Sequence, residues 1–338
     1  MNIKKLVKPN VRSLRAYQAA EIPCGVKLDA NESPYGFKTS SSIQTNRYPD
    51  PEAKALRKLM AKEFKVKPEN ILHGNGSDEL IYYLITTFGG PVLYPVPTFS
   101  MYGIIAQALG EKKVETPLDE KFDLDEDRML AIMEKTRPAL IFLSSPNNPT
   151  GNCFSSNKII RIIKHSKGVV VVDEAYQPFS DKKSFLPLLK KYNNLVILKT
   201  LSKIGFAAIR VGYMVAGTEI INETNKVRLP FNLNSLSQNM AITALKNKKQ
   251  MLSSVSSIIA ERKRLFNEMD KIDSAEPYQS DANFILFKVK NPEKTFKGLL
   301  NNGVLVRNMK GLINGCLRVT VGTPKENTAF LKALKRLL

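Results

Sequence analysis

Histidine is scarce in this sequence. His73 and His165 are the only two histidines among 338 residues. So small a number argues against a histidine-ligated metal centre and against a Ser-His-Asp triad, because both need imidazole groups at defined positions. If the chain is an enzyme, we expect no bound metal, and we expect a side chain other than histidine to carry the proton.

Cysteine is almost as rare, and long apolar runs are missing. Cys24, Cys153 and Cys316 stand far apart without a C-x-x-C pair, which favours isolated reduced thiols over a disulfide framework or a zinc site. No apolar run is long enough to span a bilayer. The first residues carry charges and prolines instead of the apolar centre of a signal peptide. We therefore expect a cytoplasmic protein.

Acidic residues are outnumbered, 31 against 51 basic ones, which gives a formal net charge of +20. Such a charge is typical of proteins that bind nucleic acid or acidic membranes. The lysines are nevertheless spread along the whole chain, and the densest clusters, 246–249 and 261–265, lie on polar faces of expected helices. We interpret the charge as solvated surface that would also attract a small anionic substrate, with nucleic-acid binding as an alternative function from another class.

The sequence does contain short apolar runs separated by amphipathic stretches. Four runs, nearly continuous in Val, Ile and Leu, occupy residues 138–145, 168–176, 194–200 and 211–217. Runs of this kind predict strands that are buried on both sides. Their alternation with helical segments predicts an α/β fold, in which a mostly parallel central sheet carries helices on both faces.

The pattern changes after these runs. A long helical segment at about 235–270 is followed by short strands at 283–289 and 316–322, which indicates a second, smaller α+β layer. The length of the chain allows two domains. The sequence predicts an N-terminal arm, a large α/β domain and a small C-terminal domain, at residues 1–30, 31–245 and 246–338.

Polar side chains follow three successive apolar runs. They are Asn148 in SSPNNPTG, Asp173 and Tyr176 in DEAY, and Lys203 in TLSK. Ligands of open α/β sheets bind beyond the carboxyl ends of the strands, so we expect these side chains to meet at one edge. Each has an ordinary explanation alone, as a turn residue, a helix cap or a solvated lysine. These ordinary explanations do not account for the occurrence of all four residues together.

An amine beside a carboxylate and a phenol suits carbonyl chemistry through a Schiff base. Pyridoxal phosphate works in this way, with a lysine that forms the imine and a carboxylate that keeps the ring nitrogen protonated. Lys203 and Asp173 could fill these two roles. Asn148 and Tyr176 could bind the phenolate oxygen of the ring.

The phosphate of such a cofactor needs hydrogen-bond donors. Residues 73–88 form a glycine-rich turn that opens a helix, and a helix N-terminus attracts anions. The candidate donors are the backbone N–H groups of Ser77 and Asp78, the hydroxyls of Thr200 and Ser202, and the guanidinium of Arg210. Tyr102 in PTFSMY could stack on the cofactor ring, or it could be an ordinary core aromatic.

The motifs SPNNPTG, VVDEAY, TLSK with the following RVGY, and GCLRVTVGT occur in that order. With them, the chain resembles the fold-type I pyridoxal-phosphate-dependent aminotransferases, and among these the histidinol-phosphate aminotransferase group. The similarity covers nearly the whole chain, from VRSLRAYQ to CLRVTVGT. It implies ping-pong transfer from L-histidinol phosphate to 2-oxoglutarate in histidine biosynthesis, giving imidazole acetol phosphate and L-glutamate.

The resemblance also implies a role for each matching residue. Lys203 matches the imine lysine and general base, Asp173 the pyridinium partner, Asn148 and Tyr176 the phenolate partners, and Tyr102 the stacking ring. The phosphate cup is matched by Gly76, Ser77, Asp78, Thr200, Ser202 and Arg210. Tyr48 matches a tyrosine that reaches the cofactor phosphate of the neighbouring subunit, which implies a homodimer with shared active sites. Arg318 matches the arginine that binds the anionic group of the substrate, and the pocket-lining positions are Tyr17, Asn31 and Arg307.

Two points stay open at this stage. Lys203 and Arg210 are seven positions apart, where the wider superfamily often has eight, so the sequence does not fix where Arg210 lies. Substrate preference is also open, because the pocket is built from both subunits and from loops such as 229–238. The alternatives on this fold are an aromatic or broad-specificity aminotransferase and a threonine-phosphate decarboxylase.

Overall fold

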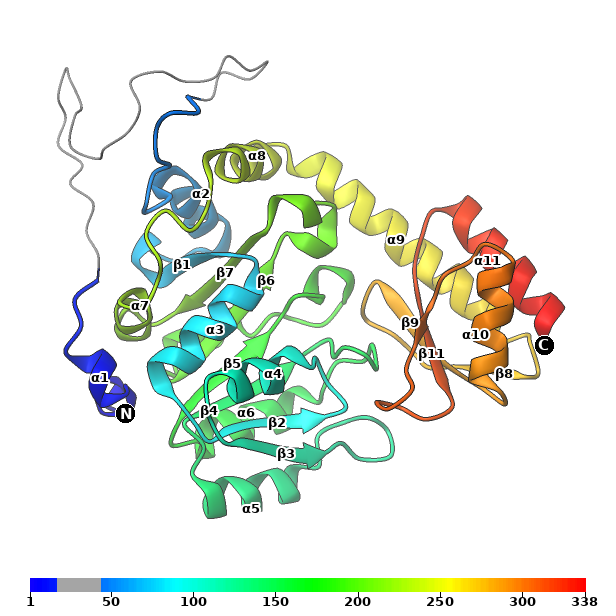
Figure 1. The fold of residues 1–338 in the computed structure, drawn as a ribbon, viewed down its shortest axis with the longest axis horizontal. Helices are drawn as coiled ribbons and strands as arrows, with labels where there is room; N and C mark the ends of the chain where they lie inside the picture. The colour runs from blue at the N-terminus through cyan, green and yellow to red at the C-terminus, as the bar shows by residue number, and fades with distance from the viewer. Residues whose placement is uncertain (17–43) are drawn as a thin grey trace.

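The computed structural model describes residues 1–16 and 44–338, which contain two sheets with their own layers of helices (Figure 1). The larger sheet has seven strands in the order β1-β7-β6-β5-β4-β2-β3. Its strands are β1 (Ile71–Asn75), β2 (Val92–Val96), β3 (Lys113–Pro117), β4 (Leu140–Ser144), β5 (Val169–Asp173), β6 (Leu195–Thr200) and β7 (Val211–Ala216).

The large sheet is mostly parallel, as the apolar runs predict. The ladders β3-β2-β4-β5-β6 are all parallel, whereas β7 is antiparallel to both of its neighbours, β6 and β1. Every residue of β4, β5, β6 and β7 is buried. These are the four continuous apolar runs, and burial on both faces explains why they do not alternate with polar residues.

Helices cover both faces of the large sheet. They are α2 (Lys54–Phe64), α3 (Ser77–Phe88), α4 (Met101–Ala108), α5 (Glu126–Thr136), α6 (Ser156–His165), α7 (Thr218–Asn225) and α8 (Ser235–Lys246). Successive residues of β5 pack to opposite sides: Val171 lies with α3 and α4, and Val172 lies with α5 and α6. This alternation places Asp173 and Glu174 on opposite sides as well.

The first sixteen residues form two short helices, η1 (Ile3–Leu6) and α1 (Pro9–Arg12). Ile3, Val7 and Val11 are buried in the same core cluster as α3 and α7. The described part of the predicted arm therefore packs against the large sheet's helices. The domain boundaries at residues 30 and 245 stay a prediction.

The long helix α9 (Lys248–Met269) follows α8 and is separated from it by Asn247. The helical segment expected at 235–270 is thus two helices. The small sheet is antiparallel in the order β10-β11-β9-β8. Its elements are β8 (Ala275–Pro277), β9 (Phe284–Val289), α10 (Pro292–Asn301), β10 (Arg307–Asn308), β11 (Cys316–Thr320) and α11 (Pro324–Leu337).

The two faces of the small sheet have different neighbours. Ile285, Phe287 and Val319 pack with α9, α10 and α11 in one core cluster. The alternate residues of the strands, among them Leu286 and Cys316, belong to a separate cluster that includes a residue of the large domain. One face of this sheet is therefore turned toward the large domain.

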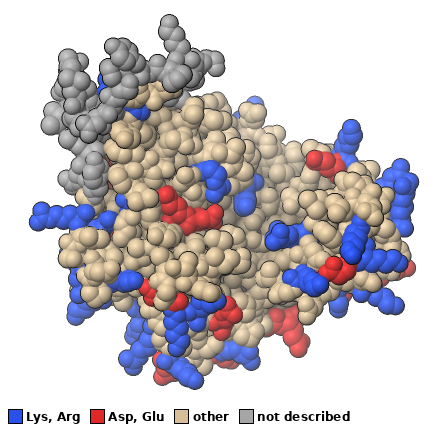
Figure 2. Space-filling view, viewed as in Figure 1, with Lys and Arg blue, Asp and Glu red and all other residues tan. Residues whose placement is uncertain are grey.

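Charge is dispersed over the face of the molecule that is shown in Figure 2. On this face, lysine and arginine side chains lie over both domains and are mixed with acidic ones. This distribution agrees with the interpretation of the net charge as solvated surface. None of the helices in the two described ranges has both the length and the apolar character that a membrane span requires.

Candidate active site

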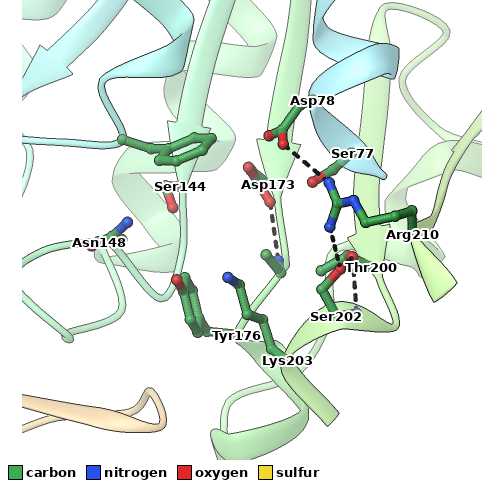
Figure 3. A pocket seen from close by; sticks show the side chains of 12 residues that line it. Ser77, Asp78, Ser144, Asn148, Asp173, Tyr176, Thr200, Ser202, Lys203 and Arg210 are labelled. Carbon is green, nitrogen blue, oxygen red and sulfur yellow. Dashed lines mark hydrogen bonds and ion pairs between the residues drawn. The ribbon is translucent and has the colours of Figure 1, made fainter. Parts of the chain in front are cut away.

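A pocket opens at the carboxyl ends of β4, β5 and β6, which are adjacent and parallel. Figure 3 shows the side chains that converge there from these strands, from α3 and from the loop after β6. Its lining residues are Ser77, Asp78, Phe99, Ser144, Asn148, Asp173, Ala175, Tyr176, Thr200, Ser202, Lys203 and Arg210. The polar residues predicted at three strand ends do meet at one edge.

Lys203 follows β6 within the short helix η5 (Ser202–Ile204). Its Nζ lies 5.6 Å from the centroid of the Tyr176 ring. Among the residues that the structure describes, Lys203 forms no ion pair. Desolvation in the pocket lowers the pKa of its ammonium group, against the opposing charge of Asp78. A lowered pKa increases the fraction of neutral amine, which is the nucleophilic form.

Asp173 is the last residue of β5, and only 4% of it is exposed. Its Oδ2 accepts a hydrogen bond from the Tyr102 hydroxyl at 2.7 Å, and its Oδ1 accepts one from the Ala175 backbone N–H at 3.0 Å. Burial raises the pKa of this carboxyl to about 6, although both hydrogen bonds act in the opposite direction. Such a carboxylate is stabilised by a ligand that presents a protonated nitrogen.

Tyr176 is buried beside Lys203 and packs edge to face on Phe284 of the small domain, with 5.2 Å between ring centroids. Burial raises the pKa of its phenol to about 12, so Tyr176 is a neutral donor at physiological pH. Asn148 lines the pocket on the same side as Tyr176, away from Arg210, in Figure 3. Its Oδ1 accepts a hydrogen bond from Arg318 Nη1.

The structure contradicts the stacking role expected for Tyr102. Tyr102 is fully buried and does not line the pocket, and its ring stacks on Phe142 with 4.7 Å between centroids. Because its hydroxyl donates a hydrogen bond to Asp173, Tyr102 fixes the orientation of a pocket residue without lining the pocket itself. Phe99, three residues earlier in the same PTFSMY segment, lies in the pocket wall instead.

Ser144 and Ala175 also line the pocket without having been predicted. Both adjoin predicted motifs, since Ser144 is the last residue of β4, within the first apolar run, and Ala175 lies between Asp173 and Tyr176. Their position at the strand ends is the signal that could have found them.

Residues of the expected anion cup lie together at the start of α3. Gly76 precedes the helix with a φ of +85°, and a Cβ there would lie only 2.5 Å from Arg210 Nη2. Glycine alone combines this backbone conformation with so close a contact. The Arg210 guanidinium donates to Ser202 Oγ at 3.3 Å and contacts Asp78 Oδ2 at 3.4 Å. Donors from two distant segments thus converge beside the helix N-terminus.

The short spacing between Lys203 and Arg210 is accommodated within the loop. Gly205 adopts a φ of +102° and Arg210 a φ of +53°, with the short helix η6 (Ala207–Ile209) between them. Thr200 closes the base of the loop, because its Oγ1 accepts from the Ser202 backbone N–H at 3.1 Å. Arg210 therefore reaches the pocket although the loop between Lys203 and Arg210 is one residue shorter than is common in the superfamily.

Two predicted arginines lie on the small sheet and are not among the residues that line the pocket, although Arg318 contacts its lining residue Asn148. Arg318 on β11 lies over the Phe284 ring, with 4.9 Å between Cζ and the ring centroid, and bonds to Asn148. Arg307 on β10 is its direct cross-strand neighbour and is exposed. Desolvation lowers the pKa of Arg318, and the charge of Arg307 acts in the same direction. A second anion could bind here.

The remaining predicted residues lie away from this pocket or outside the described residues. Tyr48 is 57% exposed and stacks on Phe231 with 4.5 Å between centroids, and it does not line the pocket. Tyr17 and Asn31 fall in residues 17–43, outside the described ranges.

A family model described as aminotransferase class I and II matches residues 17–334. The chain belongs to this aminotransferase family. The chain is 44% identical to the histidinol-phosphate aminotransferase of Aquifex aeolicus (strain VF5), over 98% of this chain and 97% of that protein. It is 39% identical to the enzyme of the same name from Caldanaerobacter subterraneus subsp. tengcongensis, over 99% of both chains.

A solved structure agrees with these relatives. The histidinol-phosphate aminotransferase from Clostridium acetobutylicum superimposes with a TM-score of 0.80 at 29% identity, over 86% of this aminotransferase and 90% of that chain. This similarity confirms the fold-type I architecture expected from the sequence.

This aminotransferase uses pyridoxal phosphate, and the pocket fits that group on three observations. The cup formed by α3 and Arg210 is chemically suited to a phosphate. Asp173 is a buried carboxylate without a contacting cation among the described residues. The Lys203 amine lies in the same pocket with a lowered pKa.

Proposed function

We propose that this protein is a histidinol-phosphate aminotransferase of histidine biosynthesis, which reversibly converts L-histidinol phosphate and 2-oxoglutarate to imidazole acetol phosphate and L-glutamate. The identity of 37–44% to curated enzymes of that name, over nearly the full chain, supports the substrate. The observation that carries the chemistry is the meeting of Lys203, Asp173 and Tyr176 in one pocket beside the N-terminus of α3.

Lys203 is the proposed catalytic residue. When bound, pyridoxal phosphate supplies an electrophilic carbon and a ring that withdraws electrons from the α-carbon of the amino donor. Lys203 Nζ would hold the cofactor, because a neutral amine is the nucleophile that this chemistry needs. As a free amine, it would take the proton from the donor's α-carbon as a general base. The lowered pKa of Lys203 serves both roles.

Asp173, Tyr176 and Asn148 are the proposed orienting residues. Asp173 would pair with the protonated ring nitrogen, and the Tyr102 hydroxyl holds the carboxylate in place. Tyr176 and Asn148, which line the same pocket, would donate to the phenolate oxygen. The phosphate would be held by the backbone of Gly76, Ser77 and Asp78 together with Thr200, Ser202 and Arg210.

Arg318 is the proposed anion-binding residue for both half-reactions. A planar guanidinium binds carboxylate or phosphate with two hydrogen bonds, so one group can serve 2-oxoglutarate and histidinol phosphate in turn. The neighbouring Arg307 adds positive charge at the same edge. Tyr17 and Asn31 are proposed to complete the pocket.

We also propose a homodimer with shared active sites, in which Tyr48 reaches the cofactor phosphate of the partner. The support is a set of exposed large apolar side chains that follow β7, namely Leu229, Leu236 and Met240, in the segment whose Phe231 stacks on Tyr48. Their exposure in a single chain suits burial against a second copy. We place this reaction in the cytoplasm, where amino-acid biosynthesis draws on glutamate.

The test is a half-reaction on the purified protein loaded with pyridoxal phosphate. The visible absorption of the bound cofactor is recorded while histidinol phosphate, phenylalanine or threonine phosphate is added separately. We expect histidinol phosphate to bleach the band and 2-oxoglutarate to restore it. Faster bleaching by phenylalanine would indicate an aromatic aminotransferase, and carbon dioxide release from threonine phosphate without an oxo product would indicate a decarboxylase.

A further inference from the structure

The turn that follows β3 links the two domains. Residues 118–124 form a tight reversal, closed by an isolated bridge between Leu118 and Leu124. In Figure 1 the loop after β3 extends toward the small sheet. At its tip, Phe122 adopts a φ of +58°, a left-handed conformation that glycine or asparagine adopts more readily than phenylalanine. A bulky aromatic at such a position indicates that its side chain has a role.

The turn is held firmly by the large domain. Lys158 of α6 donates to Leu124 O at 2.6 Å and forms an ion pair with Asp123 at 2.9 Å. The Ser155 backbone N–H donates to Asp123 Oδ1 at 2.9 Å. Within the turn, Asp119 Oδ1 accepts from the Asp123 backbone N–H at 2.8 Å. These bonds make the turn a rigid projection of the large domain.

The same turn is bonded to the loop that carries Asn148. The Asn152 side-chain amide donates to Phe122 O at 2.9 Å, and the Asn147 backbone N–H donates to Asn152 O at 2.8 Å. Asn148 follows directly and accepts from Arg318. The backbone of Phe122 is thus connected through two hydrogen bonds to a residue of the pocket.

The ring of Phe122 inserts into the small domain. It packs edge to face on Tyr278, with 5.3 Å between centroids, and joins a cluster of Leu286, Met309 and Cys316. Leu286 is the direct cross-strand partner of Arg318, and Cys316 lies two residues before Arg318 on the same strand. Phe122 therefore packs on the face of the small sheet that presents Arg318 to the pocket.

We propose that Phe122 is a positioning residue for substrate binding, which holds the small sheet so that Arg318 meets the anionic group of either substrate. This inference rests on the proposed anion-binding role of Arg318. Loss of the ring leaves the cofactor's own contacts intact, since these come from the large domain. It weakens the binding of anions by letting the small sheet shift relative to Asn148.

The experiment compares three variants in the pyridoxal-phosphate-loaded enzyme. Phe122→Gly removes the ring and suits the left-handed backbone, so it is expected to fold. Phe122→Leu keeps an apolar contact, and Lys121→Gly is the matched control, because Lys121 is exposed in the same turn. The measurements are KM for histidinol phosphate and for 2-oxoglutarate, kcat, and calorimetric binding of succinate, a dicarboxylate that cannot react.

We expect Phe122→Gly to raise both KM values and the succinate Kd by about five- to twentyfold while kcat changes less than about threefold. Phe122→Leu should recover most of the affinity, and Lys121→Gly should match the parent. The visible cofactor spectrum should be the same in all. In an Arg318→Lys background, Phe122→Gly should add no further loss, because both changes act on one contact.

Two results would overturn the inference. If Arg318→Lys weakens succinate binding but Phe122→Gly binds it as the parent does, Phe122 has no positioning role and the proposed function stands. If Arg318→Lys itself leaves succinate binding unchanged, the anion site lies elsewhere and positioning through Arg318 fails. The half-reaction with histidinol phosphate tests the proposed function independently of both.

Discussion

Two lysine and carboxylate couples lie next to each other at the ends of β5 and β6, and they face opposite sides of the sheet. Asp173 and Lys203 line the pocket. Glu174 and Lys199, the residues that adjoin Asp173 and Thr200 in sequence, form an ion pair at 2.7 Å, with side chains 1% and 9% exposed. The two couples have similar residue types and similar positions. Comparing them therefore shows which features distinguish a binding site from a structural ion pair.

The difference lies in how completely each carboxylate is partnered. Besides Lys199, Glu174 accepts hydrogen bonds from the Ser184 hydroxyl and from the Phe185 backbone N–H at 2.7 Å. Among the described residues, Asp173 accepts hydrogen bonds from two neutral donors only, and burial raises its pKa. A buried charge with a full set of partners holds a structure together, whereas one that lacks a cation is suited to bind one.

The largest expected effect comes from removing the lysine of the pocket. Lys203→Ala should abolish the cofactor's visible attachment band and lower turnover by at least about 10⁴-fold, because nucleophile and base are lost together. Unfolding by denaturant should be nearly unchanged, since Lys203 forms no ion pair among the described residues. Turnover above one tenth of the parent value would contradict the assignment.

The same substitution four residues earlier should act on stability instead. Lys199→Ala leaves Glu174 charged and buried, so the free energy of unfolding should fall by about 3–5 kcal/mol. Denaturant titration of Lys199→Ala and Lys203→Ala side by side measures the contrast. Equal stabilities in the two variants would show that the two couples do not differ in kind.

Asp173→Asn should stabilise the cofactor-free protein while impairing catalysis. The pKa of Asp173 is raised from 3.8 to about 6, so its ionisation destabilises the folded state as pH rises through this interval. The variant should match the parent below pH 4 and exceed it above pH 6 by up to about 3 kcal/mol. Unfolding measured at pH 4.0 and 7.5 tests the sign, and a variant that is less stable at pH 7.5 would refute it.

The smallest effect is expected when the structural couple is replaced as a whole. A double variant, Glu174→Gln with Lys199→Met, removes both charges and keeps similar volumes, so stability should fall by less than about 1.5 kcal/mol. Turnover should stay within about threefold of the parent, because neither residue lines the pocket. A loss as large as in Lys199→Ala would mean that the ion pair itself is needed.

Much of this organisation follows from the sequence. Continuous apolar runs predict buried parallel strands, and the carboxyl ends of parallel strands lie at one edge of the sheet. The proximity of Asn148, Asp173 and Lys203 could therefore be predicted from the sequence. The direction of β7 could not be predicted, because an apolar strand is equally buried whether it runs parallel or antiparallel to its neighbours.

The aromatic of the pocket wall was also beyond prediction from residue type. Phe99 and Tyr102 lie three positions apart, where a loop leads into α4, and from residue type alone either could stack on the cofactor ring. What separates them is a tertiary contact, the hydrogen bond from the Tyr102 hydroxyl to Asp173. Contacts between distant segments are not visible in local sequence. The same holds for Phe122 and its cluster in the small domain.

The reversed direction of β7 has a consequence for how this site tolerates change. Thr200 at the end of β6 pairs directly with Gly212 at the start of β7. The loop that carries Lys203 and Arg210 therefore leaves the sheet and returns to it at the same place. The pairing of β6 with β7 fixes both ends of this loop. Insertions and deletions within it need not shift any strand, so the length of this segment can drift among related chains while the chemistry at its base is kept.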